Sequence, residues 1–208
     1  MANIFVNGRN IEDNLDENIT IGFLIDSLQL KQGMEDKFVT EISIDGSKVD
    51  FQNPDILDRV VAQNGEIHLR LLDGVEIAFE SLDNSTHYFD VMCRKIDNIV
   101  LSLSQNSYNS ANQDFLDLVE VIDLFIQLMT NIHRTFLERF KSVYVKSTGH
   151  KNLEIHLLSV LKGLLAAKER NDVIMISDLL EYELKENITQ WKIKVIPEMK
   201  TLKNLLKN

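Results

Sequence analysis

The stretch EIHLRLLDGVEIAFE, residues 66–80, decides how this chain is divided. Its first part, Ile67–Leu71, alternates apolar and polar residues, which is the period of a strand with one buried face. Asp73-Gly74 interrupts the pattern, and Val75–Phe79 again resembles a strand. We therefore expect a hairpin at Asp73-Gly74 that extends a sheet before the chain leaves it.

Upstream of this stretch the same period of two continues, divided by turn residues. Ile4 and Val6 lead into Asn7-Gly8, which favours a hairpin because both residues tolerate positive φ. Ile42 and Ile44 lead in the same way into Asp45-Gly46. The other expected elements are a second strand at 19–23, a helix from Leu24 that ends at Gly33, and a short helix at 53–61.

This order of elements is typical of one helix packed across a mixed sheet, the β-grasp arrangement. The segments IFVNGRNI (4–11), EISIDGSKV (41–49) and ILDRVVAQNGEIHLRL (56–71) resemble parts of ubiquitin-like proteins. They resemble the first strand, the third strand with its turn, and the last helical turn with the final strand.

The sequence also departs from that family. Conjugated ubiquitin-like proteins and sulfur carriers of this fold end in Gly-Gly, whereas here the last strand runs into Leu72–Val75 and the chain continues. The outward positions are polar, so the apolar recognition patch of ubiquitin is not matched. These positions are Ser43, Asp45, His68 and Arg70. The resemblance thus implies the fold without the conjugation chemistry.

From residue 83 onward the apolar residues follow a helical period. Phe89, Met92, Ile96, Ile99 and Leu103 form a heptad seam. A longer helix then presents one apolar side, and a third follows. Their predicted core residues are Phe115, Leu118, Ile122, Phe125, Met129, Ile132, Phe136 and Phe140, and then Leu153, Leu157, Val160, Leu161, Leu164 and Leu165.

The third and fourth helices are separated only by Arg170–Asp172, which predicts antiparallel neighbours. We expect Pro197 to bend or end the fourth helix just upstream. The predicted fold is therefore α+β, with an acidic ubiquitin-like β-grasp module at 1–80 and an antiparallel four-helix bundle at 81–208.

The excess of acidic over basic side chains lies entirely in the first module. Residues 1–80 hold 16 acidic and 6 basic side chains, whereas residues 81–208 hold 16 of each. This balance argues against nucleic acid and against anionic membranes as partners. The acidic surface either keeps the protein soluble or docks on a basic partner. The single cysteine, Cys93, and the absence of a signal-peptide pattern at the N-terminus predict a cytoplasmic protein.

A search for catalytic chemistry finds no nucleotide-binding, phosphate-loop, metalloprotease or nucleophile-elbow motif. His133, His150 and His156 lack partners at metal-ligand spacing, and we expect each to be an ordinary surface or half-buried histidine. Asp178, Glu181 and Glu183 spread around their helix. We therefore expect no catalytic residues, no metal site and no cofactor.

The fourth helix has two apolar sides. Its main stripe, which we expect to face the core, comprises Ile176, Leu180, Leu184, Ile188, Trp191 and Val195. A second set lies roughly opposite and comprises Met175, Leu179, Tyr182, Ile193 and Ile196. Either the β-grasp module or the first helix covers this second face, or the face binds a partner.

These observations predict a non-catalytic intracellular adaptor or chaperone that binds another protein, either a basic or a helical one. An alternative is an accessory enzyme or sulfur-transfer protein whose site lies between the two modules. A third hypothesis is that the helices serve only to form a homo-oligomer.

Overall fold

The computed structural model describes residues 2–11, 18–31, 34, 36–144 and 149–206. The chain forms two compact units, Met1–Ile77 and Ala78–Asn208. We call them the sheet unit and the helical unit. The first holds a mixed sheet and the second consists of helices, so the protein is α+β. The boundary predicted after residue 80 falls inside a helix, α3 (Gly74–Asn84).

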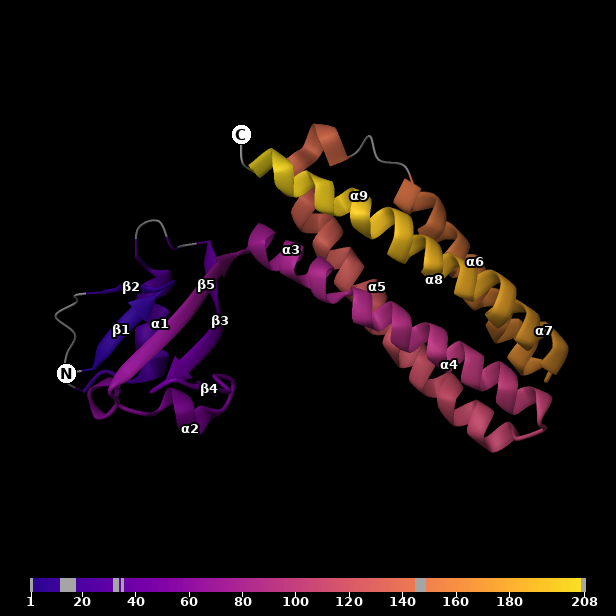
Figure 1. Cartoon of the computed structure of the whole chain (residues 1–208), viewed down its shortest axis with the longest axis horizontal. Helices are drawn as coiled ribbons and strands as arrows, with labels where there is room; N and C mark the ends of the chain where they lie inside the picture. Colours follow the sequence, from indigo (N-terminus) through magenta and orange to yellow (C-terminus); the bar gives the residue numbers. More distant parts are fainter. Residues whose placement is uncertain (1, 12–17, 32–33, 35, 145–148, 207–208) are drawn as a thin grey trace. The chain divides into compact units, whose positions relative to one another are not determined.

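The sheet has the strand order β2-β1-β5-β3-β4 (Figure 1). Its strands are β1 (Asn3–Val6), β2 (Arg9–Asn10), β3 (Lys37–Ile44), β4 (Ser47–Val49) and β5 (Glu66–Asp73). The first and last strands, β1 and β5, pair in parallel at the centre, and the other pairs are antiparallel. The predicted hairpins at Asn7-Gly8 and Asp45-Gly46 are confirmed, with positive φ at all four residues.

One face of this sheet packs against α1 (Ile21–Gln29) and a short helix, α2 (Pro54–Leu57). The short 3-10 turn η1 (Val61–Gln63) follows α2. The core residues on the strands are those that the alternation predicted, including Ile4, Val6, Ile42, Ile44, Ile67, Leu69 and Leu71.

The strand predicted at 19–23 is wrong. Thr20 makes an isolated bridge to Val60, and the chain turns at once into α1, because the Thr20 hydroxyl accepts a hydrogen bond from the Phe23 N–H. Ile21, Leu24 and Leu28 then follow the helical period and are buried. The predicted helix end at Gly33 lies outside the described residues.

The hairpin predicted at Asp73-Gly74 is also wrong, because Gly74 begins α3. The Asp73 carboxylate accepts from the Glu76 N–H at 2.8 Å, and the Glu76 carboxylate accepts from the Asp73 N–H at 2.9 Å. This reciprocal capping box starts a helix at the point where the strand ends. Beyond it, Ala78, Phe79 and Leu82 are buried at helical spacing.

The helical unit continues with α4 (Thr86–Ser104), α5 (Tyr108–Tyr144) and α6 (Gly149–Glu169). The remaining helical stretch, Val173–Leu206, is here called the C-terminal helix. Its successive segments are α7 (Val173–Asp178), η2 (Leu179–Leu184), α8 (Lys185–Gln190), η3 (Trp191–Val195), α9 (Ile196–Thr201) and η4 (Leu202–Leu206). Helix α4 packs on α5, and the C-terminal helix contacts both α4 and α6 (Figure 1).

The predicted core of these helices is largely confirmed. All five residues of the α4 seam are buried, as is the main stripe of the C-terminal helix. On α5 the predicted residues are buried except Phe115, which is half-buried. Leu165 on α6 was predicted to be a core residue, but its side chain is exposed.

The C-terminal helix does not end at Pro197. It runs on through α9, and the segment just before this proline, η3, is a π-helix, in which the Ile196 N–H bonds to the Trp191 carbonyl five residues back. The wider turn accommodates a residue that has no N–H to donate. A second π-helical segment, η2, lies nearer the start of the C-terminal helix.

Ion pairs fasten the C-terminal helix to its neighbours. Lys192 contacts Asp90 at 2.6 Å, Lys185 contacts Asp97, and Lys200 contacts Asp83 at 2.9 Å. Among the described residues, no helix is both long and apolar enough to cross a membrane.

Candidate functional site

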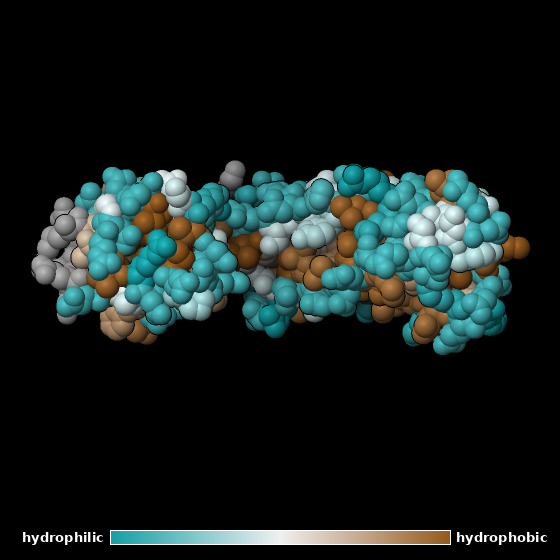
Figure 2. Space-filling model, turned by 90° about the horizontal axis from the view of Figure 1, so that it is seen from below, coloured by the Kyte–Doolittle hydropathy of each residue, from teal (hydrophilic) through white to brown (hydrophobic). Residues whose placement is uncertain are grey.

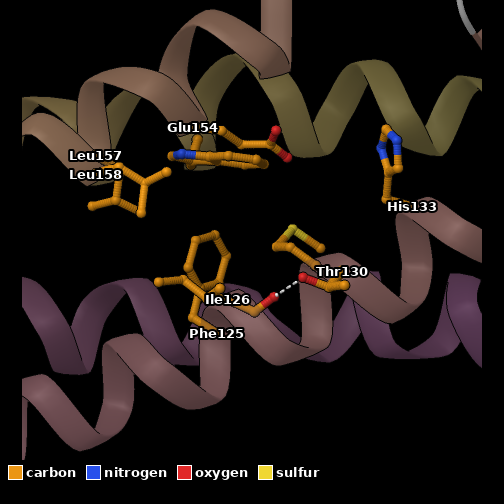
Figure 3. A pocket seen from close by; sticks show the side chains of 9 residues that line it. Phe125, Ile126, Thr130, His133, Glu154, Leu157 and Leu158 are labelled. Carbon is orange, nitrogen blue, oxygen red and sulfur yellow. Dashed lines mark hydrogen bonds between the residues drawn. The ribbon is translucent and has the colours of Figure 1, made fainter.

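A cavity of about 260 Å³ opens between α5 and α6 in the helical unit (Figure 3). We call it the α5/α6 cavity. Helix α5 and helix α6 form two of its walls, and Trp191 of the C-terminal helix contributes a third. The lining residues are Phe125, Ile126, Met129, Thr130, His133, Glu154, Leu157, Leu158 and Trp191.

Rigid aromatic packing builds part of this cavity. Phe125 packs edge-to-face on Trp191, with ring centroids 5.3 Å apart, and on Phe89 of α4 at 5.2 Å. Trp191 is only 2% exposed, and its Nε1–H has no hydrogen-bond partner among the described residues. A buried donor without an acceptor costs about 1–3 kcal/mol. Trp191 therefore contributes apolar ring surface to the lining, while its N–H group stays buried without a partner among the described residues.

Next to the cavity, three ring side chains gather where α5 ends and α6 begins. The Nδ1 atom of His133 lies 2.9 Å from the Tyr144 hydroxyl, and the His133 and His150 rings are 5.1 Å apart. Tyr144 stacks on His150 with an interplanar angle of 11°. Burial raises the pKa of Tyr144, and the Glu154 carboxylate adds to that shift. Burial lowers the pKa of His150, with Glu154 opposing that change.

A network of hydrogen bonds connects α6 to the C-terminal helix where the π-helical segment η2 ends. His156 Nε2 lies 3.0 Å from a Glu183 carboxylate oxygen, and His156 Nδ1 lies 2.9 Å from Asn187 Nδ2. The same Asn187 amide donates to the Leu153 carbonyl at 3.0 Å. Asn187 is 1% exposed, and its Oδ1 has no partner among the described residues. Glu183 is exposed and pairs with His156 across the two helices.

The second apolar face predicted on the C-terminal helix is divided by the structure. Tyr182 and Ile193 are 64% and 60% exposed, whereas Ile196 is buried at 3%. Leu179 is half-buried against α6, so close that a Cβ added at Gly163 would meet its Cδ1 at 3.2 Å. Met175 is half-buried, and its sulfur accepts a hydrogen bond from Arg170 Nη2 at 3.6 Å. Of the five predicted residues, Tyr182 and Ile193 present most of their side chains to solvent.

Apolar side chains also reach the surface elsewhere on the helical unit, as the brown areas of Figure 2 show. Two of them, Ile155 and Leu158, are more than half exposed on α6, and Leu158 lines the α5/α6 cavity. Phe125, Met129 and Leu157 were predicted to be core residues, and they are buried. No pattern in the sequence indicated that their side chains also border a cavity.

Among the described residues, no three histidine, cysteine or acidic side chains are grouped so that they could hold a metal ion. Cys93 is half-buried on α4, and burial raises the pKa of its thiol. A raised thiol pKa disfavours the thiolate, the reactive form of cysteine.

Comparison with known families places the chain in one of them. Residues 80–194 match the family described as Domain of unknown function (DUF8042), and the chain belongs to that family. Residues 2–73 are similar to the TP0873 N-terminal domain. The two matches fall on the helical unit and the sheet unit respectively. No curated protein and no solved structure matches the chain.

Proposed function

We propose that this protein is a non-catalytic adaptor or chaperone that binds another protein through its helical unit. The observation that carries the proposal is the α5/α6 cavity, an apolar hollow open to solvent with exposed Leu158 in its lining. Protein interfaces are organised around a few apolar or aromatic side chains that fill such pockets. An apolar side chain of the partner would fill the cavity and contact Phe125, Met129 and Leu157.

We further propose that the sheet unit is a ubiquitin-like β-grasp module and that the helical unit is a four-helix bundle. The strand order β2-β1-β5-β3-β4, with β1 and β5 parallel and α1 across one face, supports the first. The packing of α4 with α5, and of the C-terminal helix with α4 and α6, supports the second. The cytoplasm suits a chain with a single cysteine.

In this proposal the two units have different roles. The sheet unit carries the excess acidic charge, which steers association with a basic partner and is screened by salt. The helical unit holds the apolar pocket that keeps the partner bound. We therefore expect salt to slow the association rate more than it speeds dissociation.

The test compares Leu158→Glu with Leu124→Glu in the full chain. Both leucines are about half exposed, at 53% and 51%, but only Leu158 is in the lining of the cavity. The capture experiment compares proteins retained from native extract by the wild type and by each variant, with circular dichroism as the control for folding.

We expect at least one protein from the extract to be retained by both the wild type and Leu124→Glu. Leu158→Glu should not retain that protein. Reconstitution with that purified protein should then show the same order of affinities. If the two variants retain the same set of proteins as the wild type, the α5/α6 cavity is not a protein-binding site.

A further inference from the structure

A second cavity, of about 580 Å³, lies in the helical unit between α4, α5 and the α6–α7 connection. We call it the Lys168 cavity. Its volume falls within the roughly 300–1,000 Å³ of ligand pockets. Most of its wall is apolar, with Leu103 of α4, Phe115 of α5 and Ile176 of α7 as examples. Of the lining residues, all of which the structure describes, Lys168 alone is charged at neutral pH.

The ammonium group of Lys168 is held by neutral groups of the same wall. Its Nζ donates to Asn112 Oδ1 at 3.1 Å and lies 3.9 Å from the centroid of the Phe115 ring. Within the described residues it has no carboxylate partner. Lys95, Lys185, Lys192 and Lys200 of the same unit, in contrast, all pair with aspartates.

The Lys168 ammonium is thus partly desolvated without a counter-charge among the described residues. Desolvation lowers the pKa of Lys168, so the structure bears a cost for keeping a cation at an apolar wall. An ammonium group has three N–H donors, and the Asn112 oxygen accepts only one of them. A charge-assisted hydrogen bond to an anion would use a second donor and offset the desolvation.

We propose that the Lys168 cavity binds a small monocarboxylate with an apolar body. The carboxylate would accept from Lys168 Nζ, and the apolar body would lie along the apolar wall. A single cation favours a monoanion, because a phosphate dianion would leave a second charge uncompensated in an apolar site. Asn171, in the lining at the α6–α7 connection, supplies a side-chain amide as a second donor.

This site is separate from the α5/α6 cavity, so either proposal can fail without the other. The probe is decanoate, titrated calorimetrically into the full-length protein, with decanol and decyltrimethylammonium as neutral and cationic analogues. We expect decanoate to bind about ten-fold or more tightly than decanol, and the cation not to bind.

Lys168→Met should remove this preference and weaken decanoate binding about ten-fold, whereas Lys168→Arg should retain it. The matched control is Lys162→Met, which removes an exposed lysine of the same helix that is not in the lining. Circular dichroism before each titration verifies that the variants are folded.

Three results would overturn the proposal: decanoate fails to bind the wild type, decanol binds as tightly, or Lys168→Met binds decanoate like the wild type. If Lys168→Met does not fold, Val173→Phe replaces it. Val173 is half-buried in the lining, and a phenyl ring there narrows the cavity without altering the lysine. Binding of decanoate to Val173→Phe with unchanged affinity would equally reject the cavity as its site.

Discussion

The sheet unit and the helical unit fill their interiors in different ways. In the sheet unit, alternate side chains of the strands pack against α1 in one core, and most residues that border the hollow on the opposite face are of polar types. That lining includes Glu41, Ser43, His68 and Arg70. In the helical unit, by contrast, apolar residue types make up most of the lining of the α5/α6 cavity and of the Lys168 cavity.

The difference follows from how each kind of element is positioned. Strand register fixes every side chain to one face, and two-residue hairpins fix the register. Helices of unequal length, such as the 19 residues of α4 and the longer α5, whose backbone is kinked at Lys141, cannot match contacts along their whole lengths. The gaps between such helices are where apolar ligands or partner side chains can enter.

The largest expected effect comes from breaking one core at a time. Phe136 is fully buried in the helical unit, with its ring 4.8 Å from Phe79 and 5.5 Å from Phe140. Phe136→Ala should cost about 3–5 kcal/mol, because it removes the apolar contacts of the ring and leaves a cavity. The chain has one tryptophan, Trp191, so its fluorescence during denaturant unfolding reports on the helical unit.

The matched change in the sheet unit is Leu71→Ala, at an equally buried position. It should destabilise the sheet by about 2–5 kcal/mol and leave the Trp191 transition in place. A shift of that transition equal to the one caused by Phe136→Ala would mean that the two units unfold together.

An effect of intermediate size should come from Asn7, which ties a hairpin to the central strand. Its Oδ1 accepts from the Leu71 N–H at 2.9 Å, and its Nδ2 donates to the Leu71 carbonyl at 2.8 Å. The residue also adopts a positive φ of 49°, which asparagine tolerates better than alanine. Asn7→Ala should therefore cost the sheet unit about 2 kcal/mol.

Amide hydrogen exchange along β5 would measure this loss. Asn7→Asp keeps the acceptor for the Leu71 N–H and the tolerance of positive φ, but it sets a second acceptor against the Leu71 carbonyl, so protection should fall there too. Asn10→Ala, on the exposed strand β2, is the control and should leave exchange unchanged. Equal protection in Asn7→Ala and in the control would show that the side-chain bonds contribute nothing.

A smaller, pH-dependent effect should arise from His150. Burial lowers the pKa of this imidazole in the folded state, so the unfolded chain binds its proton at higher pH than the folded chain does. Stability should therefore fall as the pH drops below about 6.5, the ordinary histidine value, and level off below the folded-state pKa. Denaturant midpoints from Trp191 fluorescence between pH 7.5 and 5 would record the change.

The control for this prediction is His150→Phe, which keeps a flat ring stacked on Tyr144. Its midpoint should decrease less with acid than that of the wild type. If both proteins lose the same stability over this range, the lowered pKa of His150 does not govern acid sensitivity.

The sequence was sufficient for features that depend on one local pattern. The Asn7-Gly8 and Asp45-Gly46 hairpins, the alternating strands and the heptad seam of α4 all follow from residues next to each other or one helical turn apart. The hairpin expected at Asp73-Gly74 failed because two signals compete there. The Asp73–Glu76 capping box starts a helix where Asp-Gly alone indicates a turn.

The cavities could not be predicted, because their linings come from distant segments. His133 and His150 were expected to be ordinary histidines without ligand spacing, yet their rings meet across the α5–α6 connection. Lys168, Asn112 and Phe115 are brought together by packing between helices, and no period in the sequence relates them. The only sequence pattern that indicated a binding surface was the second apolar face of the C-terminal helix. In the structure Ile196 is buried and Leu179 is half-buried, so only part of that face is exposed.

The smallest effect on stability is expected from a change at the exposed face of the C-terminal helix. The same change tests whether a partner binds there or only at the α5/α6 cavity. Tyr182→Glu combined with Ile193→Glu alters only exposed side chains, so unfolding should change by less than about 0.5 kcal/mol. Leu179→Glu is the contrast, because a carboxylate there would be placed against Gly163 of α6 and should clearly lower the melting temperature.

Partner capture by the same double variant tests the binding surface. If the double variant stays folded and loses the partner that Leu158→Glu also loses, the partner spans both the α5/α6 cavity and this helix face. If it retains that partner, the α5/α6 cavity alone forms the binding site, and Tyr182 and Ile193 are solvated surface. A double variant that unfolds would contradict the exposure of these two residues and, with it, the division of the C-terminal helix into a buried and a free side.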